Sequence, residues 1–248
     1  MSHCPDQPPP DATQAKCEPT LSVVIPVFNE AGTLPELIDR IRAVPIDKEI
    51  IAIDDGSTDG SFEVLTRLAA EGDMRLLRHP INAGKGAAVR SGLAQARGRV
   101  VVIQDADLEY DPAEYPALIG PILADQADVV YGSRFISAGP RRVLYFWHYA
   151  ANRALTLLSD ALTGLNLSDI ETCYKAVRRE VATTIAPTLK ENGFGFDPEL
   201  TAKVARRGYR VYEVGISYHG RTYAQGKKIG FLDGLCVLWS ILRYAAAD

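Results

Sequence analysis

The sequence predicts an α/β fold, with a mainly parallel sheet and helices on both of its faces. Short apolar runs rich in β-branched residues alternate with segments whose apolar residues recur at helical spacing. This alternation repeats four times between residues 21 and 123, which is typical of strand–helix–strand units. Right-handed crossovers then bring helices over both faces of the sheet. We therefore expect a Rossmann-like architecture in the first half of the chain.

The individual elements are expected in the following order. Strands are predicted at residues 21–28, 49–53, 74–77, 100–103 and 128–131. The helices that follow the first four strands are predicted at residues 31–44, 61–70, 85–96 and 112–123. Two further helices are predicted at residues 143–162 and 197–206, followed by a strand at 210–217. A mobile loop is predicted at 220–230 and an amphipathic helix at 229–244.

The bulk composition is that of an ordinary globular enzyme. The chain has 248 residues, of which 47% are apolar and 23% charged, and its net charge of -4 gives no general attraction to nucleic acid. No internal repeat or long shift in composition divides it, so a single domain is expected over residues 21–248. Residues 1–20 lack the charged start and the apolar run of a signal peptide, and they are expected to form a disordered tail.

Cysteine spacing and hydropathy give expectations about the cellular location of the protein and its contact with membranes. The four cysteines form no CxxC pair, which fits a reducing, cytoplasmic location. No apolar run reaches the eighteen residues of a membrane span. The predicted helix at 229–244 has two interpretations, packing against the core or lying on a membrane surface. The basic stretch at 206–243 is likewise either a solvated face or a surface for phosphate groups and anionic lipid.

Acidic residues follow three of the predicted strands. Asn29-Glu30 follows the first strand, Asp54-Asp55-Gly56-Ser57 the second, and Asp105-Ala106-Asp107-Leu108-Glu109 the fourth. Ligands of open α/β sheets bind outside the carboxyl ends of the strands. The three loops are therefore expected to place their carboxylates on one rim of the sheet.

Asp105 and Asp107 have the spacing of a divalent-cation site. They are two residues apart across a tight turn, where both carboxylates can face one point. Hard oxygen ligands of this kind suit Mg²⁺ or Mn²⁺ held jointly with a diphosphate. An EF-hand is excluded, because its sixth and twelfth positions would be Tyr110 and Pro116. The turn at Asp54-Asp55-Gly56-Ser57 either caps the next helix or recognises a base and ribose, with Gly56 admitting the ligand closely.

Five motifs, taken in order, carry a resemblance to a known family. They are Pro26-Val27-Phe28-Asn29-Glu30, Asp54-Asp55-Gly56-Ser57, Asn82-Ala83-Gly84-Lys85-Gly86, Asp105-Ala106-Asp107 and Gly132-Ser133-Arg134. Together they resemble a family 2 glycosyltransferase, and over roughly Leu21 to Gly234 the chain is similar to dolichyl-phosphate mannosyl- and glucosyltransferases. The resemblance implies a GT-A fold, inversion at the sugar, a GDP- or UDP-sugar donor, a Mg or Mn ion and a polyprenyl phosphate acceptor.

The same resemblance implies roles for individual residues. The nucleotide would be held by Pro26, Phe28, Glu30, Ile53 and Asp55. The metal and diphosphate would be surrounded by Asp105, Ala106 and Asp107, with Glu109 completing the metal shell. Basic positions that meet phosphate groups in relatives correspond to Arg134, Arg221 and Lys227.

The chemistry of the acceptor decides which residues catalysis needs. A phosphate monoester, with a second pKa of about 6, already carries a nucleophilic oxygen at neutral pH and needs no strong base. Arg134 and Arg221 would hold that anion in line with the anomeric carbon. A saccharide or small-molecule hydroxyl, by contrast, would need a base such as Asp169 or Glu171. Both acceptors stay open at this point.

Two other classes of protein share the architecture. Sugar nucleotidyltransferases need a glycine-rich basic loop after the first strand, and Asn29-Glu30-Ala31-Gly32 does not provide one. A non-catalytic protein that binds nucleotide-sugars on the same fold is the second alternative, and the intact triplet at 105–107 argues against it.

Overall fold

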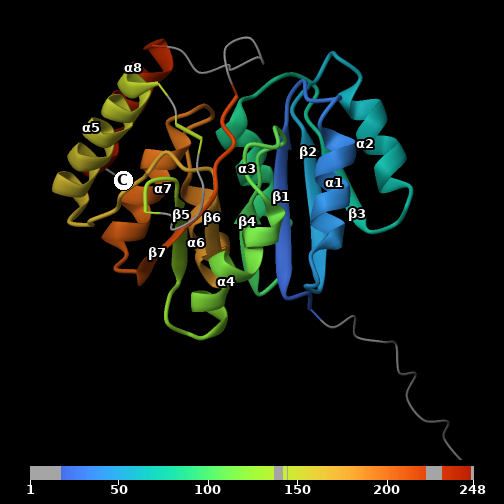
Figure 1. Ribbon diagram of the computed structural model, residues 1–248, viewed down its shortest axis with the longest axis horizontal. Coiled ribbons are helices and arrows are strands. Elements are labelled where there is room, and N and C mark those ends of the chain that lie inside the picture. Colours follow the sequence, from blue (N-terminus) through green and yellow to red (C-terminus); the bar gives the residue numbers. More distant parts are fainter. Residues whose placement is uncertain (1–17, 137–141, 144, 222–230, 247–248) are drawn as a thin grey trace, which may run out of the picture.

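The computed structural model describes residues 18–136, 142, 143, 145–221 and 231–246. A seven-stranded sheet runs through the molecule in the order β3-β2-β1-β4-β6-β5-β7, and helices cover both of its faces (Figure 1). The α/β class predicted from the alternation of strands and helices is therefore confirmed.

The first half of the chain alternates as expected. Its strands are β1 (Leu21–Val27), β2 (Lys48–Asp54), β3 (Met74–Arg78) and β4 (Val100–Ile103). Its helices are α1 (Leu34–Ala43), α2 (Ser61–Ala69), α3 (Lys85–Leu93), the short 3-10 helix η1 (Pro112–Glu114) and α4 (Tyr115–Leu123). Strand β1 pairs in parallel with β2 and β4, and β2 pairs in parallel with β3. All residues of β4 are buried, as in a sheet covered on both faces.

The second half contains three short elements that the sequence analysis did not anticipate, namely β6, α6 and η2. Its elements are β5 (Val129–Ser133), α5 (Phe146–Thr163), β6 (Lys175–Arg178), α6 (Arg179–Ile185), η2 (Ala186–Thr188), α7 (Phe196–Arg206), β7 (Val211–Gly215) and α8 (Phe231–Ala246). Strand β6 was not predicted, and it pairs antiparallel with both β4 and β5. It has four residues, too few for a periodic signal, and its two neighbours stabilise it. The sheet is therefore mixed.

Several predicted boundaries were wrong by a few residues. The first helix begins at Leu34 and not at 31, with Pro35 in its first turn, where proline costs no hydrogen bond. The helix predicted at 143–162 is α5, which ends at Thr163 and is capped by Gly164 in a left-handed conformation, with a φ of 76°. Most of the predicted tail (1–17) and of the loop predicted at 220–230 lies outside the described residues.

Helix α8 corresponds to the predicted amphipathic helix, and it packs against the domain. Val237, Ile241 and Tyr244 are buried, whereas Leu235 and Trp239 are exposed. Its neighbours in the structure are α5 and α7. In the described part of the chain, no helix has both the length and the apolar character needed to cross a membrane.

Candidate functional site

The three acidic loops meet at one edge of the sheet, and hydrogen bonds tie them together. Thr33 Oγ1, after β1, donates to the backbone oxygen of Ala106, after β4, at 2.6 Å. The backbone N–H of Asn29 donates to Ser57 Oγ, after β2, at 3.1 Å. Asn29 has a positive φ of 54°, a conformation that asparagine tolerates better than most residues. The rim that the motifs predicted is therefore a single connected structure.

Asp105 and Asp107 lie at the centre of this rim in different electrostatic surroundings. Lys85 Nζ, at the first residue of α3, lies 2.7 Å from Asp105 Oδ1. Asp107 Oδ1 accepts from the backbone N–H of Glu109 at 3.1 Å. Burial, followed by the charges of Asp105 and Glu109, raises the pKa of Asp107 to about 7. The excess of negative charge around Asp107 favours a bound cation.

Glu109 contacts Tyr218 and Arg221 in the structure. Its Oε1 accepts from the backbone N–H of Arg221 at 2.6 Å, and its Oε2 accepts from the Tyr218 hydroxyl at 2.6 Å. Across the described residues, no three His, Cys, Asp or Glu side chains are grouped so that they could hold a metal ion. The participation of Glu109 in a metal shell with Asp105 and Asp107 stays a prediction. The oxygens of Asp105 and Asp107 still fit Mg²⁺ or Mn²⁺, which commonly take only one or two protein carboxylates beside a diphosphate.

Arg221 crosses the rim from the loop after β7 to the loop after β1. Its Nη1 and Nη2 donate to Glu30 at 3.2 and 2.9 Å, and its Nε donates to the backbone oxygen of Asp107 at 3.1 Å. Glu30 orients this arginine, and its predicted contact with the nucleotide stays a prediction.

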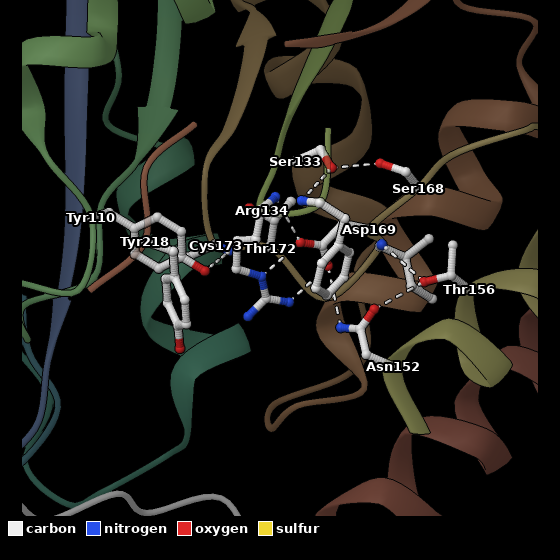
Figure 2. Close-up of polar contacts among 12 residues, drawn as sticks. Tyr110, Ser133, Arg134, Asn152, Thr156, Ser168, Asp169, Thr172, Cys173 and Tyr218 are labelled. Carbon is white, nitrogen blue, oxygen red and sulfur yellow. Dashed lines mark hydrogen bonds and ion pairs between the residues drawn. The ribbon is translucent and has the colours of Figure 1, made fainter. Parts of the chain in front are cut away.

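Arg134 follows β5 and is held by Asp169. Arg134 Nε and Nη2 donate to Asp169 Oδ2 and Oδ1 at 2.6 and 2.7 Å, a bidentate pair that Figure 2 shows. Asn152 of α5 donates to the same carboxylate at 3.2 Å, and Asp169 is fully buried. The Arg134 guanidinium lies 5.1 Å from the Tyr218 ring centroid. Asp169 therefore orients an arginine in the structure, and the general-base role considered from the sequence stays a prediction.

Asp55, predicted to hold the nucleotide, binds the protein's own backbone in the structure. Its carboxylate accepts from the N–H groups of Ala83 and Gly84 at 3.0 and 2.8 Å, and it is 2% exposed. Gly56 has a φ of 72°, and a Cβ there would lie 2.6 Å from the backbone nitrogen of Asn82. The close approach expected for a ligand at Gly56 is thus made by the chain itself.

The remaining predicted donor residues lie in or near β1 and β2. Pro26 and Ile53 are register partners in these two strands, and Ile53 is fully buried. Phe28 directly follows β1 and is 39% exposed. Lys227 lies outside the described residues.

Three residues at the site were not assigned roles from the sequence. Tyr218 links Arg134 to Glu109, Lys85 pairs with Asp105, and His79 contacts Asp55. Lys85 lies within a glycine-rich turn, and this position could have marked it from the sequence as a site residue. Nothing local marks Tyr218 or His79, because their partners are distant in sequence.

The sequence as a whole matches a family model. The model described as "Glycosyl transferase family 2" covers residues 22–185. The chain belongs to glycosyl transferase family 2. It is therefore a glycosyltransferase, which sets aside the nucleotidyltransferase and non-catalytic alternatives.

Curated relatives of this glycosyltransferase are similar over most of its length. An undecaprenyl-phosphate mannosyltransferase of Micrococcus luteus is 29% identical over 235 residues, covering 90% of this chain and 93% of the relative. A polyprenol monophosphomannose synthase of Mycolicibacterium smegmatis is 31% identical, covering 84% of this chain and 80% of the relative.

Solved structures confirm the GT-A fold of the transferase. A glucosyl-3-phosphoglycerate synthase from Mycobacterium tuberculosis, crystallised with Mn²⁺, UDP and phosphoglyceric acid, superposes with a TM-score of 0.70 at 23% identity. The match covers 99% of this chain and 85% of that structure. A second mycobacterial structure has a TM-score of 0.69 at 26% identity, and the match covers 93% of this chain and 76% of that structure.

Proposed function

We propose that this glycosyltransferase moves a hexose, with inversion, from a GDP- or UDP-sugar to a polyprenyl phosphate, and that it uses Mg²⁺ or Mn²⁺. The observation that supports a phosphate acceptor is the pair of oriented arginines beside the acidic rim. Two curated relatives are named for transfer to polyprenyl phosphates, which supports the same acceptor class.

The two arginines belong to one connected array. Arg134 lies against the Tyr218 ring, the Tyr218 hydroxyl donates to Glu109, and Glu109 accepts from the backbone of Arg221. Arg221 also donates to the backbone of Asp107, so the array ends at the proposed metal site. Guanidinium groups suit the planar recognition of phosphate oxygens. A phosphate acceptor bound between them would lie near the donor's diphosphate.

Carboxylates fix these arginines before a ligand binds. Asp169 holds one edge of Arg134, and Glu30 holds the terminal nitrogens of Arg221. Preorganised donors avoid part of the entropy cost of ordering the site around a reacting anion. Because the phosphate is itself nucleophilic, these residues would position it without removing a proton.

The donor's leaving group would meet Asp105, Asp107 and Lys85. The two aspartates would hold the cation, which when bound neutralises charge on the departing nucleoside diphosphate. Lys85 adds a positive charge 2.7 Å from Asp105. Phe28, exposed at the rim, would stack on the base.

The outer surface of α5 supports a lipid-borne acceptor. Phe146, Trp147 and Leu157 are 66%, 78% and 70% exposed, whereas the residues that α5 buries are Thr156 and Ser159. Leu155 and Leu158 of the same helix pack against the core, so α5 carries apolar side chains on its outer surface as well as on its inner one. Tryptophan and other aromatic side chains favour the membrane interface, so we place this face against a membrane.

The same helix connects that face to the site. Asn152 of α5 contacts the Asp169 carboxylate that holds Arg134 (Figure 2). In Figure 1, α8 lies beside α5, and it adds Trp239 at 65% exposure. The free thiols of Cys173 and Cys236 fit the cytoplasmic side of the membrane.

The deciding experiment is a panel of UDP- and GDP-sugars incubated with the protein, Mn²⁺ or Mg²⁺ and short polyprenyl phosphates, with products identified by mass. We expect a lipid-phosphate hexose that disappears in Asp107→Ala and falls at least tenfold in Arg221→Ala. The matched controls are Glu63→Ala and Arg67→Ala, both exposed on α2 and expected to behave as wild type. Donor hydrolysis without lipid product would overturn the acceptor, and absence of donor binding would overturn the whole proposal.

A hydroxyl acceptor is the second candidate, favoured by Glu171. Its Oε1 is buried without a hydrogen-bond partner, and burial, followed by the charge of Asp197, raises its pKa to about 8. A carboxyl with a pKa in this range can accept a proton from a hydroxyl near neutral pH. Glycosylation of a saccharide that Glu171→Gln abolishes would favour this candidate.

A further inference from the structure

A chain of carboxylate, imidazole and hydroxyl groups lies behind the donor side of the rim. His79 Nδ1 is 2.6 Å from Asp55 Oδ1, and His79 Nε2 is 2.9 Å from Ser91 Oγ. Asp55 follows β2, His79 follows β3 and Ser91 belongs to α3, so three elements meet here. The proposed transfer uses neither His79 nor Ser91.

The chemistry of these groups determines the direction of each hydrogen bond. An ionised carboxylate only accepts, so His79 Nδ1 carries the proton that Asp55 receives. In a neutral imidazole the other nitrogen is then an acceptor, and the Ser91 hydroxyl donates to it. Ser91 thus holds the far nitrogen of the ring, as donor to a neutral imidazole or as acceptor from a protonated one, while Nδ1 faces Asp55.

The same carboxylate controls the start of α3. Its Oδ1 is shared between His79 and the N–H of Ala83, and its Oδ2 accepts from the N–H of Gly84. The next residue is Lys85, whose Nζ lies 2.7 Å from Asp105 Oδ1. A continuous path of contacts thus runs from His79 to the proposed diphosphate site.

The opposite side of this turn is anchored separately. The N–H of Gly86 donates to the backbone oxygen of Asn192 at 2.7 Å, and Arg90 Nη2 donates to Asn192 Oδ1 at 2.8 Å. A Cβ at Gly84 would lie 2.3 Å from the Asn192 oxygen, so the backbones are in close contact. Loss of His79 would therefore move the turn on the Asp55 side without releasing it from the fold.

We propose that His79 is a positioning residue for donor binding, which with Ser91 orients Asp55 so that the 83–84 turn places Lys85 against Asp105. This role rests on the proposed function, because its readout is the affinity for a nucleoside diphosphate or its sugar. The ring nitrogens of His79 contact Asp55 and Ser91, so we assign it a role through Asp55.

The test compares four variants for UDP and GDP affinity with Mn²⁺, by calorimetry, and for the donor KM and kcat. In His79→Ala we expect the donor KM to rise about tenfold with kcat within about twofold, because a turn is displaced while the reacting groups remain. His79→Asn keeps a donor toward Asp55 and should recover most of the affinity. In Ser91→Ala the nucleotide affinity should fall about threefold. The control is Thr66→Ala, which removes a hydroxyl on α2 that donates to the backbone oxygen of Phe62, and its nucleotide affinity should equal that of wild type.

Unchanged donor affinity in both His79→Ala and Ser91→Ala overturns the proposal, as does a fall in kcat alone. If His79→Ala does not fold, Ser91→Ala and His79→Asn carry the comparison. Amide hydrogen exchange at Ala83 and Gly84 in the ligand-free protein separates this role from the proposed function. If wild type binds neither nucleotide, the function fails, while unaltered exchange at these amides in the variants independently overturns the positioning role.

Discussion

At the scale of single residues, the site is organised by ion pairs that fix charged groups before a ligand binds. Asp169 holds Arg134 through two hydrogen bonds, and Glu30 holds Arg221 in the same manner. Motif reasoning identified both arginines, but their partners are 35 and 191 residues away in sequence. Through-space pairing at these separations leaves no local pattern to detect.

The Asp169→Asn substitution distinguishes an orienting role from that of a general base. It leaves the largely buried Arg134 without its counter-charge, so we expect a loss of about 3 kcal/mol in the free energy of unfolding. Acceptor kcat/KM should fall at least tenfold, with the donor KM unchanged. Denaturant unfolding and steady-state kinetics measure both effects. Wild-type stability combined with the loss of a titration in the pH–rate profile would instead indicate a base.

Glu171→Gln should change how stability depends on pH. The folded-state pKa of about 8 lies above the usual value of 4.5, so the stability that Glu171 contributes is complete below pH 4.5 and is lost as the pH rises to 8. Glutamine does not ionise, and the variant should exceed wild type by on the order of 2 kcal/mol at pH 8.5, with the difference shrinking toward pH 5. Thermal unfolding across this range measures it. A constant difference would contradict the raised pKa.

At the scale of elements, α5 departs most from the usual relation between sequence and burial. It turns Thr156 and Ser159 inward and Trp147 and Leu157 outward. Helical periodicity predicted this helix, but periodicity does not say which face meets the domain. In the structure, Asn152 and Thr156 make polar contacts near Asp169, and Leu155 and Leu158 pack against the core.

The α5 face can be tested with vesicles of anionic lipid. The double variant Trp147→Asp with Leu157→Asp places charge on the apolar face, and we expect vesicle binding to fall at least tenfold. Donor affinity should be unchanged, because the donor site lies on other elements. Leu123→Asp, at an exposed position of α4, is the matched control. Sedimentation with vesicles measures binding, and equal binding by all proteins would show that this face does not meet lipid.

At the scale of the whole molecule, ligand binding at the rim should stabilise the entire domain. The three acidic loops come from one half of the sheet and the arginines from the other, so a ligand between them links both halves. At a concentration 100 times its dissociation constant, a UDP- or GDP-sugar with Mn²⁺ adds about 2.7 kcal/mol, which corresponds to a rise in Tm of roughly 5–10 °C. Differential scanning fluorimetry measures the shift. We expect EDTA or Asp107→Ala to remove it, and a shift that survives both would contradict the metal assignment.

The sequence alone determined the α/β class, the parallel first half and the acidic rim. These three features depend on local periodicity and on the residues directly after strands, and both can be recognised within short stretches of the sequence. The tertiary structure alone decided that β6 enters the sheet antiparallel, that Glu109 faces Tyr218, and that Asp55 binds its own backbone. Those features depend on which distant groups meet in space. A four-residue strand or a buried carboxylate takes its role from the partners that the completed fold brings to it.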